Sequence, residues 1–229
     1  IPDGAEPPTL SATGCYADTA AHTLAPQVVP FTIQSPLWSD GAAKRRFVVV
    51  PDGAALGYTP SGALEVPVGT LLIKEFWLEG IAGDPATRFP VETRFLAKRC
   101  EEGGCATPWQ GYSYVWDADG ADGTLLDTAI ATRIDWAVEA ADGDAVDHAH
   151  IYPGRDECVR CHSVAAGRVL GVQAAQLDRP TSYAGIIDNQ LAALSAAGLL
   201  TGAPADGGAW LPSSLDPSFS PEDRSRAYL

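Results

Sequence analysis

Short runs of apolar and β-branched residues alternate with polar positions along the first two thirds of the chain. A period of two is typical of strands that bury one face and expose the other. The pattern predicts six strands, at residues 29–33, 46–50, 70–78, 89–97, 111–116 and 133–138. Turn sequences rich in proline, aspartate and glycine separate them. Six such strands before residue 140 predict an antiparallel sandwich or a barrel-like sheet.

The pattern changes near residue 145. A short helix is predicted to begin just after Gly154, where acidic residues in the first turn suit the helix dipole. Apolar residues then recur every three or four positions between residues 183 and 200. This spacing predicts a second helix, with Ser182 as its N-cap and Gly198 as its end.

The chain is therefore predicted to be mainly β with a small C-terminal α-helical segment. It contains 229 residues, of which 46% are hydrophobic, so it can bury a substantial core. No flexible linker separates the two parts, and we expect the helical segment to pack on the β domain. The predicted organisation is an irregular leader at 1–24, a β domain at 25–145 and a helical segment at 146–229.

Charge and hydropathy exclude two classes of partner. The formal net charge of −14 argues against nucleic acid, whose binders need a basic face to replace phosphate counterions. No apolar run reaches the roughly 18 residues of a membrane helix, so no transmembrane segment is expected. The chain begins at Ile1 rather than Met, which indicates a processed or trimmed product.

The candidate chemistry lies in Cys158-x-x-Cys161-His162, the attachment sequence for c-type haem. Two thiols three residues apart on one helical turn can each add to a haem vinyl group, and the next residue can bind the iron. We predict one covalent haem c with His162 as the proximal ligand, which makes the helical segment at 146–229 the haem c-binding part of the chain. Zinc and redox thiols are alternatives, although the chain lacks the βαβ context of a thioredoxin-like pair and a second pair at zinc-finger spacing.

Several further motifs resemble a bacterial family of uncharacterised exported proteins that end in a C-x-x-C-H segment. They are residues 10–14 (LSATG), 35–46 (SPLWSDGAAKRR), 67–70 (PVGT), 91–94 (VETR) and 109–116 (WQGYSYVW), and the C-terminal segment is 152–177. The C-x-x-C-H part is also similar to monohaem c-type cytochromes. The resemblance implies export and covalent haem, in the periplasm or at the cell surface, and a membrane tether outside this sequence is an alternative. It names no substrate.

The sequence does not identify the distal iron ligand directly, because methionine is the usual distal ligand in c-type cytochromes and the chain has none. We predict His150, which the chain can carry past the haem edge to the distal face, with His148 second and His22 third. In an extended segment His148 and His150 project to one side. An open or water-bound sixth position is the main alternative. A solvated acidic turn and a two-histidine copper or zinc clip are further interpretations of this pair.

Other charged and cysteine residues have weaker assignments. Four arginines near the motif could pair with haem propionates or could be solvated; they are Arg155, Arg160, Arg168 and Arg179. Cys100 and Cys105 flank a Gly-Gly turn between predicted strands, so we predict a hairpin disulfide there, which an oxidising compartment permits. Cys15 could pair with either of them or be free.

These patterns predict an exported haem c protein that carries single electrons. Its acidic surface would favour a redox partner with a positive patch. One alternative is a haem enzyme or small-ligand sensor with an open iron site. Another is a binding module with a haem accessory, for which aromatic residues supply a surface; they are Trp38, Trp77, Trp109, Trp116 and Trp136.

Overall fold

A computed structural model describes residues 6–204 and 210–228 of the chain. The protein is mainly β, as predicted, and most of its strands pair antiparallel. The backbone forms two compact units, which are described separately. The first unit contains residues 1–30, 38–49 and 71–161, and the second contains residues 31–37, 50–70 and 162–229. The predicted division at residue 145 instead falls at the start of a strand, Ala145–Tyr152.

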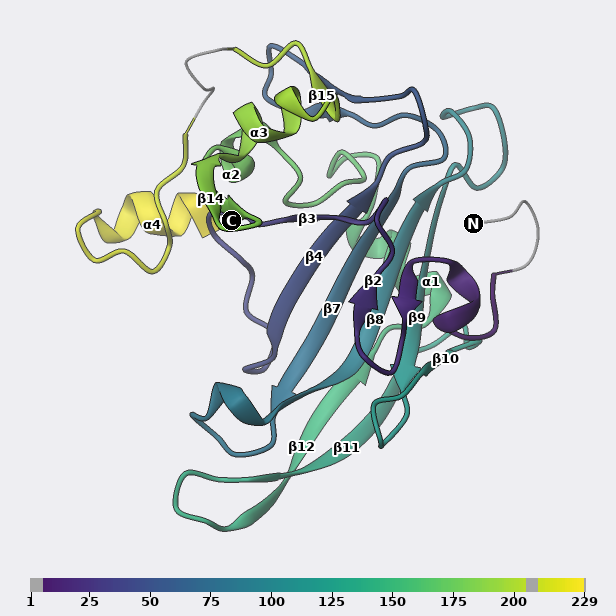
Figure 1. Cartoon of the computed structure of the whole chain (residues 1–229), viewed down its shortest axis with the longest axis vertical. Helices are drawn as coiled ribbons and strands as arrows, with labels where there is room; N and C mark the ends of the chain where they lie inside the picture. The colour runs from purple at the N-terminus through teal and green to yellow at the C-terminus, as the bar shows by residue number, and fades with distance from the viewer. Residues whose placement is uncertain (1–5, 205–209, 229) are drawn as a thin grey trace. The chain divides into compact units, whose positions relative to one another are not determined.

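A six-stranded sheet in the order β10-β9-β8-β7-β4-β3 forms the frame of the first unit (Figure 1). The sheet ends in β10 and β3 at its two edges, so it is open and not a closed barrel. Pairing is antiparallel from β4 through β7, β8 and β9 to β10. The strands are β3 (Val29–Phe31), β4 (Ala43–Val49), β7 (Leu71–Glu79), β8 (Arg88–Lys98), β9 (Trp109–Trp116) and β10 (Gly123–Leu125).

One face of this sheet carries the main core. Phe47, Ile73, Phe95 and Tyr112 alternate with residues of the other face and are buried. The N-terminal segment packs on them through residues such as Tyr16. The leader is therefore not irregular, because it folds into η1 (Ser11–Thr13), β1 (Tyr16–Asp18) and β2 (Thr23–Leu24), in front of the sheet in Figure 1.

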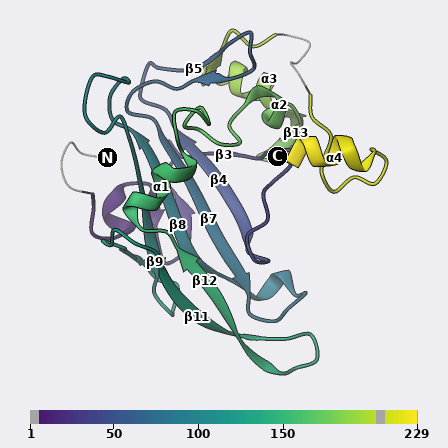
Figure 2. The ribbon, with the colours of Figure 1, turned by 180° about the vertical axis from the view of Figure 1, so that it is seen from behind.

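The opposite face of the sheet is covered by a hairpin and a helix, both seen in front in Figure 2. The hairpin pairs β11 (Thr132–Glu139) with β12 (Ala145–Tyr152), and α1 (Arg155–Cys161) follows β12 directly. Helix α1 lies against β9. The Tyr152 hydroxyl donates to the Val91 carbonyl (3.0 Å) and accepts from the Trp136 indole N–H (2.9 Å), which ties the hairpin to β8. We call this side of the sheet the α1 face. A short 3₁₀ helix, η2 (Pro85–Thr87), precedes β8.

The second unit has a smaller sheet and three short helices. β15 (Leu200–Thr201), β5 (Leu56–Tyr58) and β6 (Leu64–Glu65) form the sheet, with β15 parallel to β5. The helices are α2 (Ala174–Leu177), α3 (Gln190–Ala196) and α4 (Pro221–Tyr228). The fully buried Gln190 bonds both backbone groups of Thr32, at 2.8 and 2.9 Å, and thereby joins distant segments of the chain.

The predicted helix at 183–200 is correct only in its second half. Its first half is a hairpin of β13 (Pro180–Tyr183) and β14 (Ile186–Asn189), and Asn189 rather than Ser182 caps α3. The Asn189 side chain accepts from the Leu191 N–H at 2.9 Å. In the part of the chain that the structure describes, no helix is long and apolar enough to cross a membrane.

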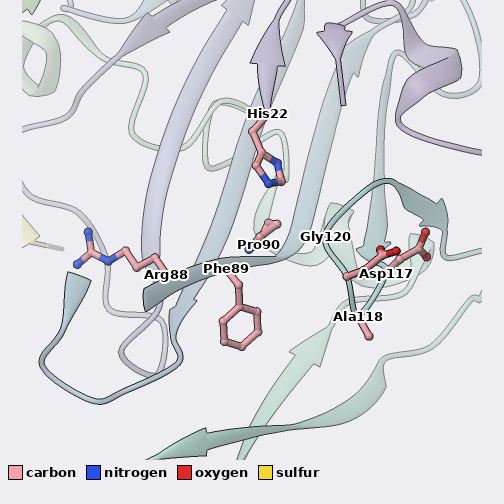
Figure 3. A pocket seen from close by; sticks show the side chains of 8 residues that line it. His22, Arg88, Phe89, Pro90, Asp117, Ala118 and Gly120 are labelled. Atoms are coloured by element: carbon pink, nitrogen blue, oxygen red, sulfur yellow. The ribbon is translucent and has the colours of Figure 1, made fainter. Parts of the chain in front are cut away.

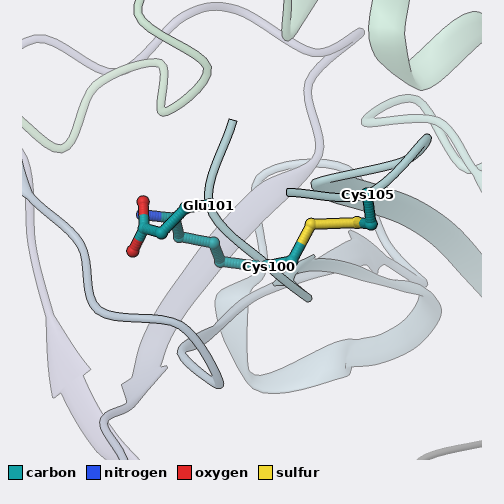
Figure 4. The surroundings of a disulfide bond; sticks show 4 residues. Cys100, Glu101 and Cys105 are labelled. Atoms are coloured by element: carbon teal, nitrogen blue, oxygen red, sulfur yellow. A yellow bond between two sulfur atoms is a disulfide. The ribbon is translucent and has the colours of Figure 1, made fainter. Parts of the chain in front are cut away.

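The predicted disulfide is present. Cys100 and Cys105 are joined across a tight loop between β8 and β9, with Glu101 beside them (Figure 4). Cys15 is free and lies between η1 and β1, where its side chain is buried in the core.

The disulfide is expected to add modestly to stability, because it closes a short loop. Replacing Cys100 and Cys105 together by serine should lower the free energy of unfolding by about 2 kcal/mol, the loop-entropy value for so few residues. Urea unfolding of the two proteins measures the difference. A change near zero would show that the hairpin holds the loop closed without the bond, and non-reducing peptide mapping checks the pairing itself.

Candidate haem-attachment site

Helix α1 begins in a well-defined way. The Glu157 carboxylate reaches back to accept from the Gly154 N–H (3.0 Å), one half of a capping box. Arg155 forms salt bridges with Glu6 (2.9 Å) and Asp127 (3.0 Å). No side chain fits at position 154, because a Cβ added to Gly154 would lie 2.4 Å from the Ala129 backbone. The start of the helix is thus anchored within the first unit.

Close contact with β9 fixes the first motif thiol. A Cβ added to Gly111 would lie 2.5 Å from Cys158 Cβ and 2.8 Å from its Sγ, so only glycine lets the helix approach this strand. Cys158 is half-buried and burial raises the pKa of its thiol, whereas Cys161 is exposed. Both thiols are free. Their spacing places them on one side of a single helical turn, as thioether attachment requires.

His162 follows α1 directly and begins the last segment of the second unit. Its Nδ1 lies 2.6 Å from the Arg168 carbonyl, and Arg168 Nη1 donates to the His162 carbonyl at 3.0 Å. A carbonyl can only accept, so Nδ1 carries the proton and a neutral ring has its lone pair at Nε2. This is the tautomer of a metal-binding histidine oriented by a backbone carbonyl.

The residues present therefore fit a covalently attached haem. Two unpaired thiols at the required spacing are followed by an imidazole in the correct tautomer. Large apolar side chains close to the motif in sequence are exposed: Val159 (42%), Val164 (67%) and Leu170 (41%). Among the described residues, no three His, Cys, Asp or Glu side chains gather as a metal-ion site.

His150 is held in a buried charged network on the α1 face. Its Nε2 lies 2.7 Å from Glu92 Oε2, and its ring packs edge-on against Phe76 and Tyr152. Glu92 is fully buried and also accepts from Arg94 Nε (2.6 Å) and Nη2 (2.8 Å). Burial alone would raise the pKa of Glu92, but Arg94 and His150 together lower it. Iron ligation through Nε2 would require His150 to leave Glu92.

The other histidines are placed differently. His148 shares the inner side of β12 with His150, as the i, i+2 spacing predicts, and its buried Nε2 has no hydrogen-bond partner among the described residues. His22 packs edge-on against Trp77 and Trp116 on the opposite face of the sheet. It borders a pocket of about 150 Å³ with Arg88, Phe89, Pro90 and the loop at 117–120 (Figure 3).

The arginines close to the motif in sequence are engaged by the protein. Arg155 is paired as described, and Arg160 is exposed with Glu157 at 3.9 Å. Arg168 and Arg179 donate to the carbonyls of His162 (3.0 Å) and Ile33 (2.6 Å). Sequence reasoning missed a second set of cations, Arg46, Lys74 and Arg94, because they are distant in sequence and only strand pairing brings them together.

The tryptophans do not form a common surface. Trp109 and Trp116 are buried, Trp77 and Trp136 are half-buried, and Trp38 is exposed.

Comparison of the chain with protein-family models, with curated proteins and with solved structures finds no match.

Proposed function

We propose that this chain is an exported haem c protein that transfers single electrons in the periplasm or at the cell surface. The observation that carries the proposal is the pair of free thiols on α1 followed by His162, whose Nδ1 is oriented by the Arg168 carbonyl. Bound there, the haem would supply a one-electron iron couple. The chain would hold it covalently, orient the proximal imidazole and set the polarity around it.

The acidic surface supports a partner of opposite charge. A net charge of −14 would draw a redox partner with a positive patch by long-range attraction. Export rests on covalent haem c and on the disulfide Cys100–Cys105, since such bonds persist in oxidising compartments. Electron-transfer rates with a basic partner should therefore fall as ionic strength rises.

The identity of the distal iron ligand distinguishes electron transfer from a second candidate function. Replacing His150 by alanine is expected to convert a low-spin ferric spectrum to high-spin, whereas His148→Ala should leave it low-spin. A strong second nitrogen ligand keeps ferric iron low-spin, and His150 is the histidine nearest the motif in sequence. Visible and electron paramagnetic resonance spectra of the three proteins measure the change. A switch in His148→Ala alone would move the assignment to His148.

The second candidate is a haem enzyme or small-ligand sensor with an open sixth position. It is favoured by the Glu92 carboxylate, which already holds His150 Nε2 at 2.7 Å. In that case the wild-type ferric protein is high-spin and its ferrous form takes up carbon monoxide. A wild-type protein that is low-spin in both states and takes up none is incompatible with this candidate.

A further inference from the structure

Three cations lie side by side across neighbouring strands on the α1 face. Arg46 on β4 is directly opposite Lys74 on β7, and Lys74 is directly opposite Arg94 on β8. Opposed residues in an antiparallel sheet project to the same side, and like charges in that position destabilise the pair. We call these residues the cationic row. It costs the fold free energy unless a negative group lies on it.

The chain itself supplies one fully buried carboxylate to this row. Glu92 accepts a two-pronged pair of hydrogen bonds from Arg94 and contacts His150, so it is engaged at one end. Within residues 6–204 and 210–228, no carboxylate forms a salt bridge with Arg46 or Lys74. Burial, followed by the charges of Arg94 and Arg46, lowers the pKa of Lys74 to about 7. Among the described residues, the charge of Glu92 also acts on Lys74, but neither Lys74 nor Arg46 is paired directly with a carboxylate.

The cationic row ends beside the haem-attachment helix. Arg94 is directly opposite Ser113 on β9, and Gly111, two residues away on the same side of that strand, lies under Cys158. The Ser113 hydroxyl is buried and has no hydrogen-bond partner among the described residues. Arg94 is also close enough to act on the pKa of the Cys158 thiol. A group attached to Cys158 would therefore lie over this face.

We propose that the cationic row, together with the Ser113 hydroxyl, receives the propionate carboxylates of a haem c attached at α1. This assignment rests on the proposed function. A haem carries two propionates, which are anionic and stay charged when they are paired with cations. An arginine fork binds a carboxylate through two parallel hydrogen bonds, and lysine contributes a point charge. The propionates would supply carboxylates that pair directly with Arg46 and Lys74.

The test uses the haem-loaded protein and charge-changing variants. Lys74→Met should lower the ratio of reduced to oxidised protein at a fixed potential by about fivefold, because a nearby cation favours the added electron. The propionate bending modes in the resonance Raman spectrum should shift as well. Lys74→Arg keeps the charge and should preserve both readouts. Arg133→Gln, a matched loss of one positive charge on the exposed side of β11, should also leave both unchanged.

The outcomes separate this assignment from the proposed function. Intact mass comes first: wild-type protein without covalent haem overturns the proposed function. If haem is attached but Lys74→Met behaves as Arg133→Gln does in both readouts, the propionate assignment is overturned and the electron-carrier proposal stands. Arg46→Met provides a second, independent variant should Lys74→Met fail to fold, and the same fall in the ratio and the same Raman shift are expected.

Discussion

Replacing Cys158 and Cys161 together by serine is expected to remove all covalent haem from the protein. The two thiols are free, share one side of α1 and precede His162, so they are the attachment points that the structure offers. The wild-type protein should exceed the mass of its polypeptide by one haem, and acid–acetone should not extract its colour. The double variant should have the polypeptide mass alone.

A matched control separates the effect of losing the motif cysteines from the effect of losing any two sulfur atoms. Cys100→Ser/Cys105→Ser removes as many sulfur atoms but leaves α1 untouched, so it should retain one haem per chain. Wild-type protein that binds stoichiometric zinc at the motif, or that carries extractable haem, would contradict the haem c proposal. Either result would move Cys158 and Cys161 to a metal or redox-thiol role.

Replacing Arg94 by methionine is expected to destabilise the protein by about 3–5 kcal/mol at neutral pH, the range measured when one member of a buried charge pair is removed. Glu92 is fully buried, and Arg94 supplies two of its hydrogen bonds. The variant would leave the carboxylate with His150 alone. Arg94 also lies over the Phe76 ring, 4.4 Å from its centroid, a contact that methionine only partly replaces. Urea unfolding at pH 7 measures the loss.

The loss of stability in Arg94→Met is expected to depend on pH. The pKa of Glu92 is lowered in the folded protein, so its contribution to stability is present above pH 4.5 and is lost as the pH falls through its folded pKa. In Arg94→Met the carboxyl can become neutral by binding a proton. The deficit should therefore shrink on acidification. Arg133→Met, whose partner Asp135 is exposed, should cost at most about 1 kcal/mol, and an equal cost in both variants would contradict the argument.

Four strands lie within two residues of their predicted bounds: β7, β8, β9 and β11. β7, β8 and β9 could be predicted because they are rich in β-branched and aromatic residues and are buried for most of their length. β11, in the hairpin, alternates half-buried with exposed side chains. β4 begins at Ala43, three residues before the predicted start at Arg46, because the cations Lys44 and Arg45 do not resemble the start of a strand. A strand that carries several cations is missed when strands are predicted from the pattern of hydrophobic residues.

The remaining misses have local causes. At 183–189 the apolar spacing is helical, yet Ala184 and Gly185 both have positive φ and form the two-residue turn of a hairpin. Alanine is not typical of such turns, so nothing in the sequence indicated the hairpin. Ile186 and Ile187 are exposed, so their helix-like spacing does not reflect packing against a core. In the leader, Leu10 at the start of η1 and Tyr16 in β1 are buried, but each of these elements has only three residues. A search for periodic hydrophobic residues cannot detect single buried residues in elements this short.

For the candidate site, the sequence was enough for local features only. The order of Cys158, Cys161 and His162 predicts the attachment chemistry because the two thiols lie about one helical turn apart and the histidine follows directly. Neither the Glu92 contact of His150 nor the cationic row follows from spacing. Both depend on which strands are neighbours, and β12, which carries His150, has too many polar residues to be recognised as a strand.

The buried Cys15 makes the N-terminal layer a built-in reporter of opening. Its thiol is almost fully enclosed in the core and burial raises its pKa, so both access and thiolate formation are suppressed in the folded state. Alkylating reagents can reach it only when the segment of η1, β1 and β2 detaches or the whole protein unfolds. Cys100 is bonded to Cys105, so if Cys158 and Cys161 carry haem as proposed, pulse labelling would follow one sulfur atom. Its rate would compare the opening of that layer with global unfolding, without any engineered probe.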